Sequence, residues 1–333
     1  MHESEYAELR HLVKQKGLLD RQPFYYTYKI LLTLGLLSLG LSFLLLIDNF
    51  WLQLLSAAYL AFAFTQIGFI GHDAGHREIC RAAWKDEIIG LFCSLLIGVS
   101  YSWWTDTHNR HHGNPNQLGL DPAIDFLAPA FTEEQARIKH GVLWFIVKYQ
   151  AYFFFPLLSM YPFSMRMNSI QFLIQKKTKH PLAEALFLVT HFILYFGLVF
   201  SRLDIQQAVL FIIVHQALFG LYAGSVFACN HKGMPILDKE SQLDFLRRQV
   251  LTTRNLKSNP FIDFWYGGLN YQIEHHLFPT MARNKLGEAQ KIVKPFLLAH
   301  SITYHETGVL RSYWEILQYF HQVSAPLRQE KTR

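Results

Sequence analysis

The sequence predicts an all-α integral membrane protein with four transmembrane helices in two hairpins. Three observations support this fold class. The 333 residues are 51% hydrophobic and 15% aromatic, which is more apolar than a typical soluble domain. Four apolar runs of at least 17 residues, arranged in two closely spaced pairs, contain no Asp, Glu, Lys or Arg. Basic residues also lie almost entirely on one side of the topology that these runs define.

The four charge-free runs cover residues 30–47, 49–71, 185–201 and 205–229. Each can cross a hydrocarbon core of roughly 30 Å, which takes about 17–25 helical residues. Only short links around Asp48 and around Leu203 separate the members of each pair, so the chain crosses the membrane and returns twice. Residues 1–29 are thus expected to form an N-terminal segment, and residues 30–333 one membrane domain.

The basic residues predict the orientation. Of the 31 Lys and Arg residues, only Arg202 lies in a hairpin link. Because positive charge is enriched in cytoplasmic segments, both termini and the long middle segment are expected in the cytosol. The net charge of +6 suits anionic lipid head groups, and we do not expect nucleic-acid binding. The three cysteines include no CxxC pair and imply no disulfide framework.

Two further apolar stretches, 88–104 and 143–165, lie between the hairpins. Charged residues precede the first, and the second contains Lys148, Pro156 and Pro162. We expect both to be helices in the membrane interface, where aromatic residues are stable. A six-span alternative, in which both cross, would place more basic charge outside. Farther along, residues 285–298 predict an amphipathic helix in a cytosolic helical cap.

Histidines gather in three groups on the predicted cytosolic side. The motifs GHDAGH, HNRHH and QIEHH contain His72, His76, His108, His111, His112, His275 and His276, with Gln272 opening the third. Spacings of three and four place side chains on one face of a helix. Seven imidazoles exceed the needs of one tetrahedral zinc. They fit two metal ions with nitrogen donors and open positions.

Other residues near these motifs are candidates for supporting roles. Ligating histidines commonly donate their second N–H to a carboxylate or carbonyl, so Asp73, Asp106, Asn109 and Glu274 are candidate partners or ligands. Trp103 and Trp104 could line a substrate channel or anchor the chain in the interface. His191 and His215 lie within charge-free runs, and we expect them to have structural roles.

The three motifs resemble the HxxxH, HxxHH and QxxHH histidine boxes of the membrane fatty acid desaturases. The glutamine resembles the front-end or Δ6-type branch, which is grouped with linoleoyl-CoA desaturases. The resemblance covers about residues 25–295 and implies a di-iron centre with a further histidine after the last span. His231 stands there, beside Asn230. Gln272 occupies a position where many relatives have histidine, so it is a candidate ligand, water-mediated contact or hydrogen-bond partner.

The resemblance implies an enzyme that uses O2 and two Fe ions to form a cis double bond in a lipid- or CoA-linked acyl chain. The protein would hold the chain so that one pair of carbons reaches the metals. The sequence has no Gly-rich dinucleotide, CxxCH haem or Cys-cluster motif, so the electron donor is expected to be separate: ferredoxin, cytochrome b5 or a flavin reductase. The sequence has no HPGG cytochrome b5 motif, which favours a bacterial plasma membrane, and the double-bond position stays open.

Two alternatives use similar residues. A lipid or alkane hydroxylase of the same histidine-rich class would need the same metals and topology. A zinc-dependent membrane hydrolase needs about three ligands, and a metal transporter should carry ligands within its spans. Histidine-rich sites can also take up zinc during purification, so a bound zinc ion would not identify the native metal.

Overall fold

The computed structural model describes residues 2–329, and these are almost entirely helical. Contacts between Cα atoms divide the chain into two compact units. We call Arg21–Asp106 with Leu158–Ser225 the helical-hairpin unit, and Met1–Asp20, Thr107–Leu157 and Val226–Arg333 the histidine-rich unit. The predicted division at residues 29 and 30 stays a prediction.

Four helices in the described residues are long and apolar enough to cross a membrane: α2 (Pro23–Leu46), α3 (Phe50–Gly75), α10 (Pro181–Arg202) and α11 (Ile205–His231). They confirm the four predicted apolar segments, but most extend beyond the predicted ends. The additional turn of α3 carries the first histidine motif, and the additional residues of α11 include His231. Helices therefore begin or end where their caps lie rather than where hydrophobicity stops.

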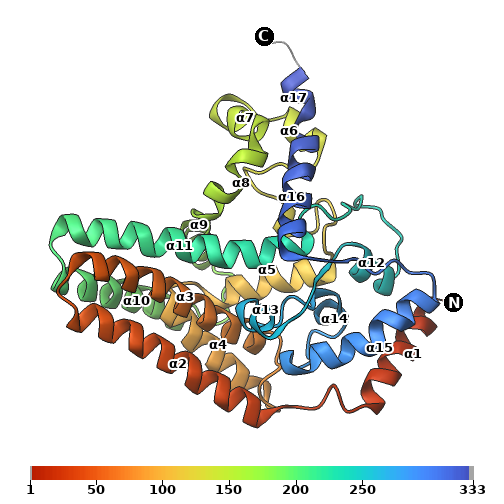
Figure 1. The fold of residues 1–333 in the computed structure, drawn as a ribbon, viewed down its shortest axis with the longest axis horizontal. Helices are drawn as coiled ribbons and strands as arrows, with labels where there is room; N and C mark the ends of the chain where they lie inside the picture. Colours follow the sequence, from red (N-terminus) through yellow and green to blue (C-terminus); the bar gives the residue numbers. More distant parts are fainter. Residues whose placement is uncertain (1, 330–333) are drawn as a thin grey trace. The chain divides into compact units, whose positions relative to one another are not determined.

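The first hairpin is closed by local contacts between α2 and α3, which lie side by side (Figure 1). The side chain of Asn49 accepts a hydrogen bond from the Leu52 amide and caps α3. Buried Gln53 donates to the Leu44 carbonyl at 3.0 Å, which satisfies a carbonyl at the end of α2. At Gly40 a Cβ atom would lie 2.6 Å from Leu60 Cδ2, so glycine permits the close approach.

The stretch 88–104, expected to be one interfacial helix, is divided between α4 (Ala83–Ile97) and α5 (Tyr101–Gly113), which are bent by 110°. Gly98 ends α4 with a φ of +73°, a conformation that glycine adopts easily. Buried Glu184, from α10, accepts from the Ser102 amide at 3.1 Å at the start of α5. The carboxylate thus accepts from a backbone N–H in the first turn of α5. In a continuous helix this N–H would donate to a carbonyl of the preceding turn.

The stretch 143–165 is also divided, into α7 (Gly141–Lys148), α8 (Gln150–Leu158) and the start of α9 (Tyr161–Ile174). Helices α7 and α8 are bent by 104°. Pro162 stands in the first turn of α9, where a missing N–H costs no helical hydrogen bond. By length and composition the described chain has four spans, or up to six if each bent pair counts as one.

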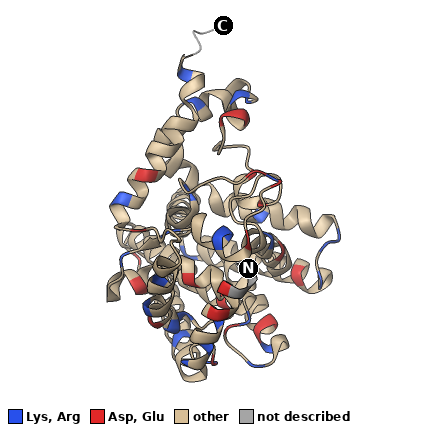
Figure 2. Ribbon diagram, turned by 90° about the vertical axis from the view of Figure 1, so that its right-hand side faces the viewer, with Lys and Arg blue, Asp and Glu red and all other residues tan. Residues whose placement is uncertain are grey.

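In the helical-hairpin unit, α4 packs against α3 and α10, and α10 also packs against α2 and α9. The histidine-rich unit holds the shorter helices: α1 (His2–Gln15), α6 (Glu133–Arg137), α12 (Phe245–Leu251), α13 (Pro260–Trp265), α14 (Gln272–Leu277), α15 (Leu286–Ala299), α16 (Val309–Val323) and α17 (Ala325–Gln329). It also contains the 3₁₀ turns η1 (Pro122–Ile124) and η2 (Arg283–Lys285), and β1 (Asn255–Leu256) pairs in parallel with β2 (Glu306–Thr307). Basic and acidic segments of the ribbon are interspersed in Figure 2.

The N-terminal helix is part of the core of the histidine-rich unit. Leu9 and Val13 are fully buried, and α1 packs against α12 and α15. The Tyr6 hydroxyl donates to the Leu277 carbonyl at 2.9 Å, and its ring stacks on Phe278. Since α14 carries the third histidine motif, α1 supports that motif directly. The predicted amphipathic helix at residues 285–298 is confirmed as α15.

Candidate metal centre

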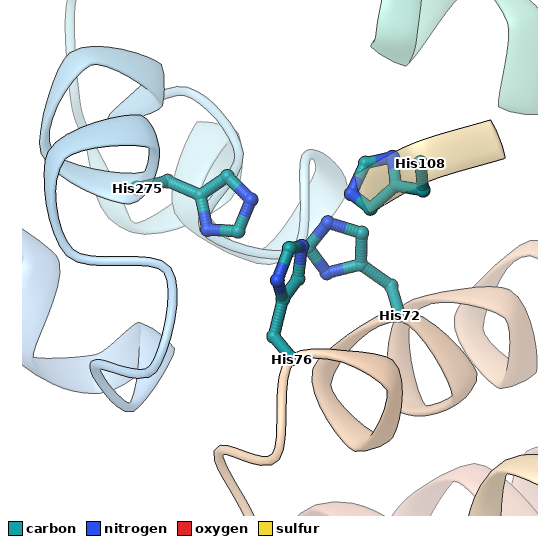
Figure 3. A group of neighbouring side chains, drawn as sticks. All are labelled: His72, His76, His108 and His275. Atoms are coloured by element: carbon teal, nitrogen blue, oxygen red, sulfur yellow. The ribbon is translucent and has the colours of Figure 1, made fainter. Parts of the chain in front are cut away.

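The first histidine motif lies at the C-terminal end of α3. His72 and His76 are buried, and their ring centroids are 4.7 Å apart; Figure 3 shows both rings side by side. The Trp104 ring lies 5.6 Å from the His72 ring. A Cβ atom at Gly75 would lie 2.3 Å from that indole, so the glycine leaves room for Trp104 beside the motif.

A carboxylate accompanies this first motif. Oδ1 of Asp73 is 3.3 Å from Nδ1 of His72, and both side chains are buried. One ligand atom each of His72, Asp73 and Glu78 lie within 4.8 Å of one another. Glu78 also accepts a hydrogen bond from Tyr26 at 2.6 Å. The structure therefore places Asp73 where the sequence predicted a partner.

The second motif lies in the part of α5 that belongs to the histidine-rich unit. The ring centroids of His108 and His112 are 4.6 Å apart. The third motif forms α14, where Gln272, His275 and His276 are all buried. The His112 ring stacks on His276 at 4.0 Å and meets His275 at 4.8 Å. These two motifs are thus in direct contact.

His108 and His275 form a second point of approach between these motifs. They come from α5 and α14 and are labelled in Figure 3. A ring nitrogen of one lies within 4.8 Å of a ring nitrogen of the other. The histidine-rich unit therefore brings together every histidine of the second and third motifs.

The last residue of α11, His231, joins the same unit. Its ring centroid lies 4.5 Å from His111 and 4.6 Å from His276. One ring nitrogen of each of the three lies within 4.8 Å of the others, and all three side chains are buried. We call His111, His231 and His276 the three-histidine group.

Each ring of the three-histidine group is oriented by an oxygen at Nδ1. Asp121 Oδ2 is 2.9 Å from His111, the Thr252 carbonyl is 3.2 Å from His231, and Gln249 Oε1 is 2.8 Å from His276. Since these oxygens accept, each Nδ1 carries the hydrogen and each neutral ring has its lone pair at Nε2.

The lone pairs then converge without a proton between them. Nε2 of His111 lies 3.3 Å from Nε2 of His231. Nε2 of His276 is buried and has no hydrogen-bond partner among the described residues. Burial and neighbouring imidazoles hold the pKa of His276 well below its ordinary value. Three imidazoles whose Nε2 atoms lie close together fit the coordination of a cation such as iron, zinc or copper.

The partner Asp121 lies ten positions after His111. Burial alone would raise its pKa, but His111 and Lys232 outweigh burial and lower the pKa to about 2. An ionised carboxylate at Nδ1 increases the basicity of a ligating imidazole. Asp121, Gln249 and Thr252 were missed by the sequence analysis because they lie outside the motifs, and no local spacing marks them.

Other predicted residues occupy different environments. Glu274 is buried, and its carboxylate accepts hydrogen bonds from Asn255 Nδ2 at 2.6 Å and from the Tyr304 hydroxyl at 2.8 Å. Burial raises its pKa to about 7. Asp106 and Asn109 are exposed on α5. The Trp103 amide donates to Ser100 Oγ at 3.1 Å and so helps to cap α5.

Gln272 and Asn230 lie beside the three-histidine group. Gln272 Nε2 is 3.0 Å from His231 Nε2, and Gln272 Oε1 accepts from Asn230 Nδ2 at 3.0 Å. Both amides are buried. The structure therefore brings Gln272, Asn230 and His231 together, and their roles at a metal centre stay predictions.

Comparisons with known proteins place the chain in the fatty acid desaturase family. A family model described as fatty acid desaturase matches residues 49–308. The chain is 32% identical to a Δ6 fatty-acid desaturase of Caenorhabditis elegans, covering 90% of this chain and 70% of that protein. It is 28% identical to an acyl-lipid (9-3)-desaturase of Physcomitrium patens, covering 96% of this chain but only 62% of the relative. It is 29% identical to a Δ8 fatty-acid desaturase of Euglena gracilis, covering 91% and 74%.

Proposed function

Because the chain belongs to the fatty acid desaturase family, we propose that it introduces a cis double bond into a lipid- or CoA-linked acyl chain. The three named relatives are all fatty-acid or acyl-lipid desaturases. The reaction removes one hydrogen from each of two adjacent carbons. It consumes O2, two electrons and two protons and releases two molecules of water.

The observation that carries the proposal is the convergence of the three-histidine group. Facing lone pairs on His111 and His231, 3.3 Å apart, repel unless a cation lies between or beside them. Acid–base side chains cannot cleave an unactivated methylene C–H bond, so the chemistry belongs to a cofactor. Two irons held by the histidines would supply the reduction of O2.

We propose two ligand sets. The three-histidine group would hold one metal. His108, His112 and His275 come together within the same unit and would contribute to the second metal. His72 and His76 are also proposed as ligands, because their motif resembles the first histidine box of the desaturases.

The protein side chains would orient these ligands. The Nδ1–H groups of the three-histidine group donate to Asp121, Gln249 and the Thr252 carbonyl. These hydrogen bonds would fix each ring so that its Nε2 is available to a metal ion. The Trp104 indole packs against His72 and is a candidate wall for the acyl chain. Asp73 would orient His72.

A membrane setting follows from four helices long and apolar enough to cross a bilayer. We propose that both termini and the histidines face the cytosol, because the basic residues flank that side. Electrons would come from a separate ferredoxin, cytochrome b5 or flavin reductase. All the named relatives come from eukaryotes, and the bacterial plasma membrane stays a prediction.

The test is gas chromatography with mass spectrometry of fatty acids from cells that express the chain. A new unsaturated acid should appear with the parent chain and with His321→Ala, which removes an exposed histidine. It should be absent with His111→Ala. A hydroxylated product would instead support the hydroxylase alternative. No new product, despite expression and a supplied electron donor, would refute the proposal.

A further inference from the structure

The orientation of two buried amides assigns a role to Gln272. We infer that Asn230 holds Gln272 so that its amide nitrogen, not its oxygen, faces the metal side of His231. Gln272 then presents an N–H group, which cannot ligate a metal ion. The inference rests on the proposed metal centre and identifies which part of the third histidine motif coordinates.

The orientation of Asn230 follows from a backbone partner. Its Nδ2 donates to the Leu269 carbonyl at 2.8 Å, and a carbonyl oxygen can only accept. Its Oδ1 accepts from Cys229 Sγ at 3.2 Å. The side chain is fully buried, so no solvent can replace these partners. The amide nitrogen of Asn230 is therefore the atom directed toward Leu269.

That orientation determines the orientation of Gln272. The same Nδ2 lies 3.0 Å from Gln272 Oε1, which must therefore be the acceptor. Rotating the Gln272 amide by half a turn would place its NH2 group against the NH2 group of Asn230. Two donors would then face each other in a buried site, which is unfavourable because neither hydrogen bond is made.

The other end of Gln272 gives the same assignment. Nδ1 of His231 donates to the Thr252 carbonyl, so Nε2 of His231 is an acceptor. Gln272 Nε2 lies 3.0 Å from it and supplies the matching donor. The reversed amide would place Oε1 against the imidazole lone pair. With Gln272 in this orientation, all four hydrogen bonds in the series Leu269, Asn230, Gln272, His231 and Thr252 pair a donor with an acceptor. The reversed Gln272 amide would mismatch two of them.

Two consequences follow for the proposed centre. Only His275 and His276 of α14 would ligate. The third motif would therefore supply one ligand fewer than a motif that begins with histidine. If His231 used its Nε2 lone pair to hold a metal ion, the hydrogen bond from Gln272 to that nitrogen would be lost, and the Gln272 N–H would be available to another acceptor near His231. There it favours an oxygen acceptor such as water.

The first experiment titrates the purified full-length chain with ferrous iron in anaerobic detergent solution. Gln272→Leu, which keeps side-chain bulk but removes the amide, is compared with His231→Ala and with the exposed control Gln242→Leu. We expect Gln272→Leu to weaken iron binding by about 10-fold yet reach the parent's iron content at saturation. His231→Ala should saturate at a lower content, and Gln242→Leu should match the parent.

Saturation of Gln272→Leu at the reduced content of His231→Ala would overturn the inference, because a ligand would have been lost. A parent chain that binds no iron would remove the proposed function together with the inference. The two failures are therefore distinguishable in one titration.

A second experiment reverses the amide. Asn230→Asp replaces the donor beside Gln272 with an acceptor, so Gln272 should turn and present Oε1 to the iron. X-ray absorption at the iron edge should then differ from the parent. The change should disappear when Gln272→Leu is combined with Asn230→Asp. An unchanged spectrum in Asn230→Asp, with saturating iron and parental circular dichroism, would contradict the assignment.

Discussion

Buried histidines occur in both units, but they do not all have the properties of metal ligands. In the helical-hairpin unit, His191 Nδ1 lies 3.0 Å from the Leu95 carbonyl and His215 Nδ1 lies 2.7 Å from the Tyr195 hydroxyl. Their Nε2 atoms have no hydrogen-bond partner among the described residues. The same is true of His276 in the three-histidine group.

Neither burial nor an unpartnered nitrogen therefore distinguishes a ligand. The histidines differ in whether their ligand atoms lie close to those of at least two other residues. Neither His191 nor His215 belongs to a set of three ligand atoms among the described residues, whereas His276 does. His191 and His215 join α10 to its neighbours, whereas the three-histidine group gathers residues from α5, α11 and α14.

The largest expected effect is that of His276→Ala. Losing a partner of a ligand typically costs about 10–100-fold in metal affinity or activity, so losing a proposed ligand should cost more than about 100-fold. Product formation, measured by mass spectrometry, should fall to background. Activity within a factor of ten of the parent would remove His276 from the ligand set.

A smaller effect is expected for Gln249→Leu. Gln249 accepts from His276 Nδ1 and also donates to the His112 carbonyl at 2.9 Å, so its loss frees the imidazole to rotate. Iron affinity should fall by about 10–100-fold, with unchanged content at saturation. Titration with iron measures this, and Gln242→Leu serves as the control. Unchanged affinity would show that the ring is held by packing alone.

His215→Phe tests a buried histidine of the helical-hairpin unit. It removes a hydrogen bond between α11 and Tyr195 of α10 but no proposed ligand. Interhelical hydrogen bonds in membranes contribute about 0.6–1.7 kcal/mol, so stability should fall by that amount and iron content should not change. Thermal unfolding in detergent and metal analysis measure the two quantities. Loss of iron in a folded variant would mean that this pair also supports metal binding.

The smallest effect is expected for Tyr6→Phe. The change removes the bond from α1 to the Leu277 carbonyl and keeps the ring packed on Phe278. One net hydrogen bond contributes about 1 kcal/mol. The variant should unfold slightly earlier and retain its iron. The exposed Tyr28→Phe change is a matched control, and an equal loss of stability in both would show that α1 does not stabilise α14 through this bond.

Some site residues could be predicted from the sequence because their spacing is local. His72 and His76 are one helical turn apart, and His111 and His112 lie on one short helix. Which residues orient them could not be predicted. Asp121, Thr252 and Gln249 reach the histidines through folding of the 107–157 and 226–333 segments, and no sequence period records such contacts.

Each of the two stretches expected to be interfacial helices, 88–104 and 143–165, is divided by a bend, and its location in the interface stays a prediction. Hydrophobicity alone does not end a helix. The break after α4 depends on Glu184, which lies 82 positions after Ser102 and accepts from its amide. A distant carboxylate thus stabilises a helix start within an apolar stretch.

The sequence by itself determined the four apolar helices and the histidine motifs, because hydrophobic length and helical spacing are properties of neighbouring residues. Only the tertiary structure decided which ring nitrogen of each histidine has a hydrogen-bond partner, that Glu274 accepts from Tyr304, and how Asn230 orients Gln272. These features depend on hydrogen-bond partners brought together by packing. The orientation of each buried side chain is determined only when every donor and acceptor of the network has a hydrogen-bond partner.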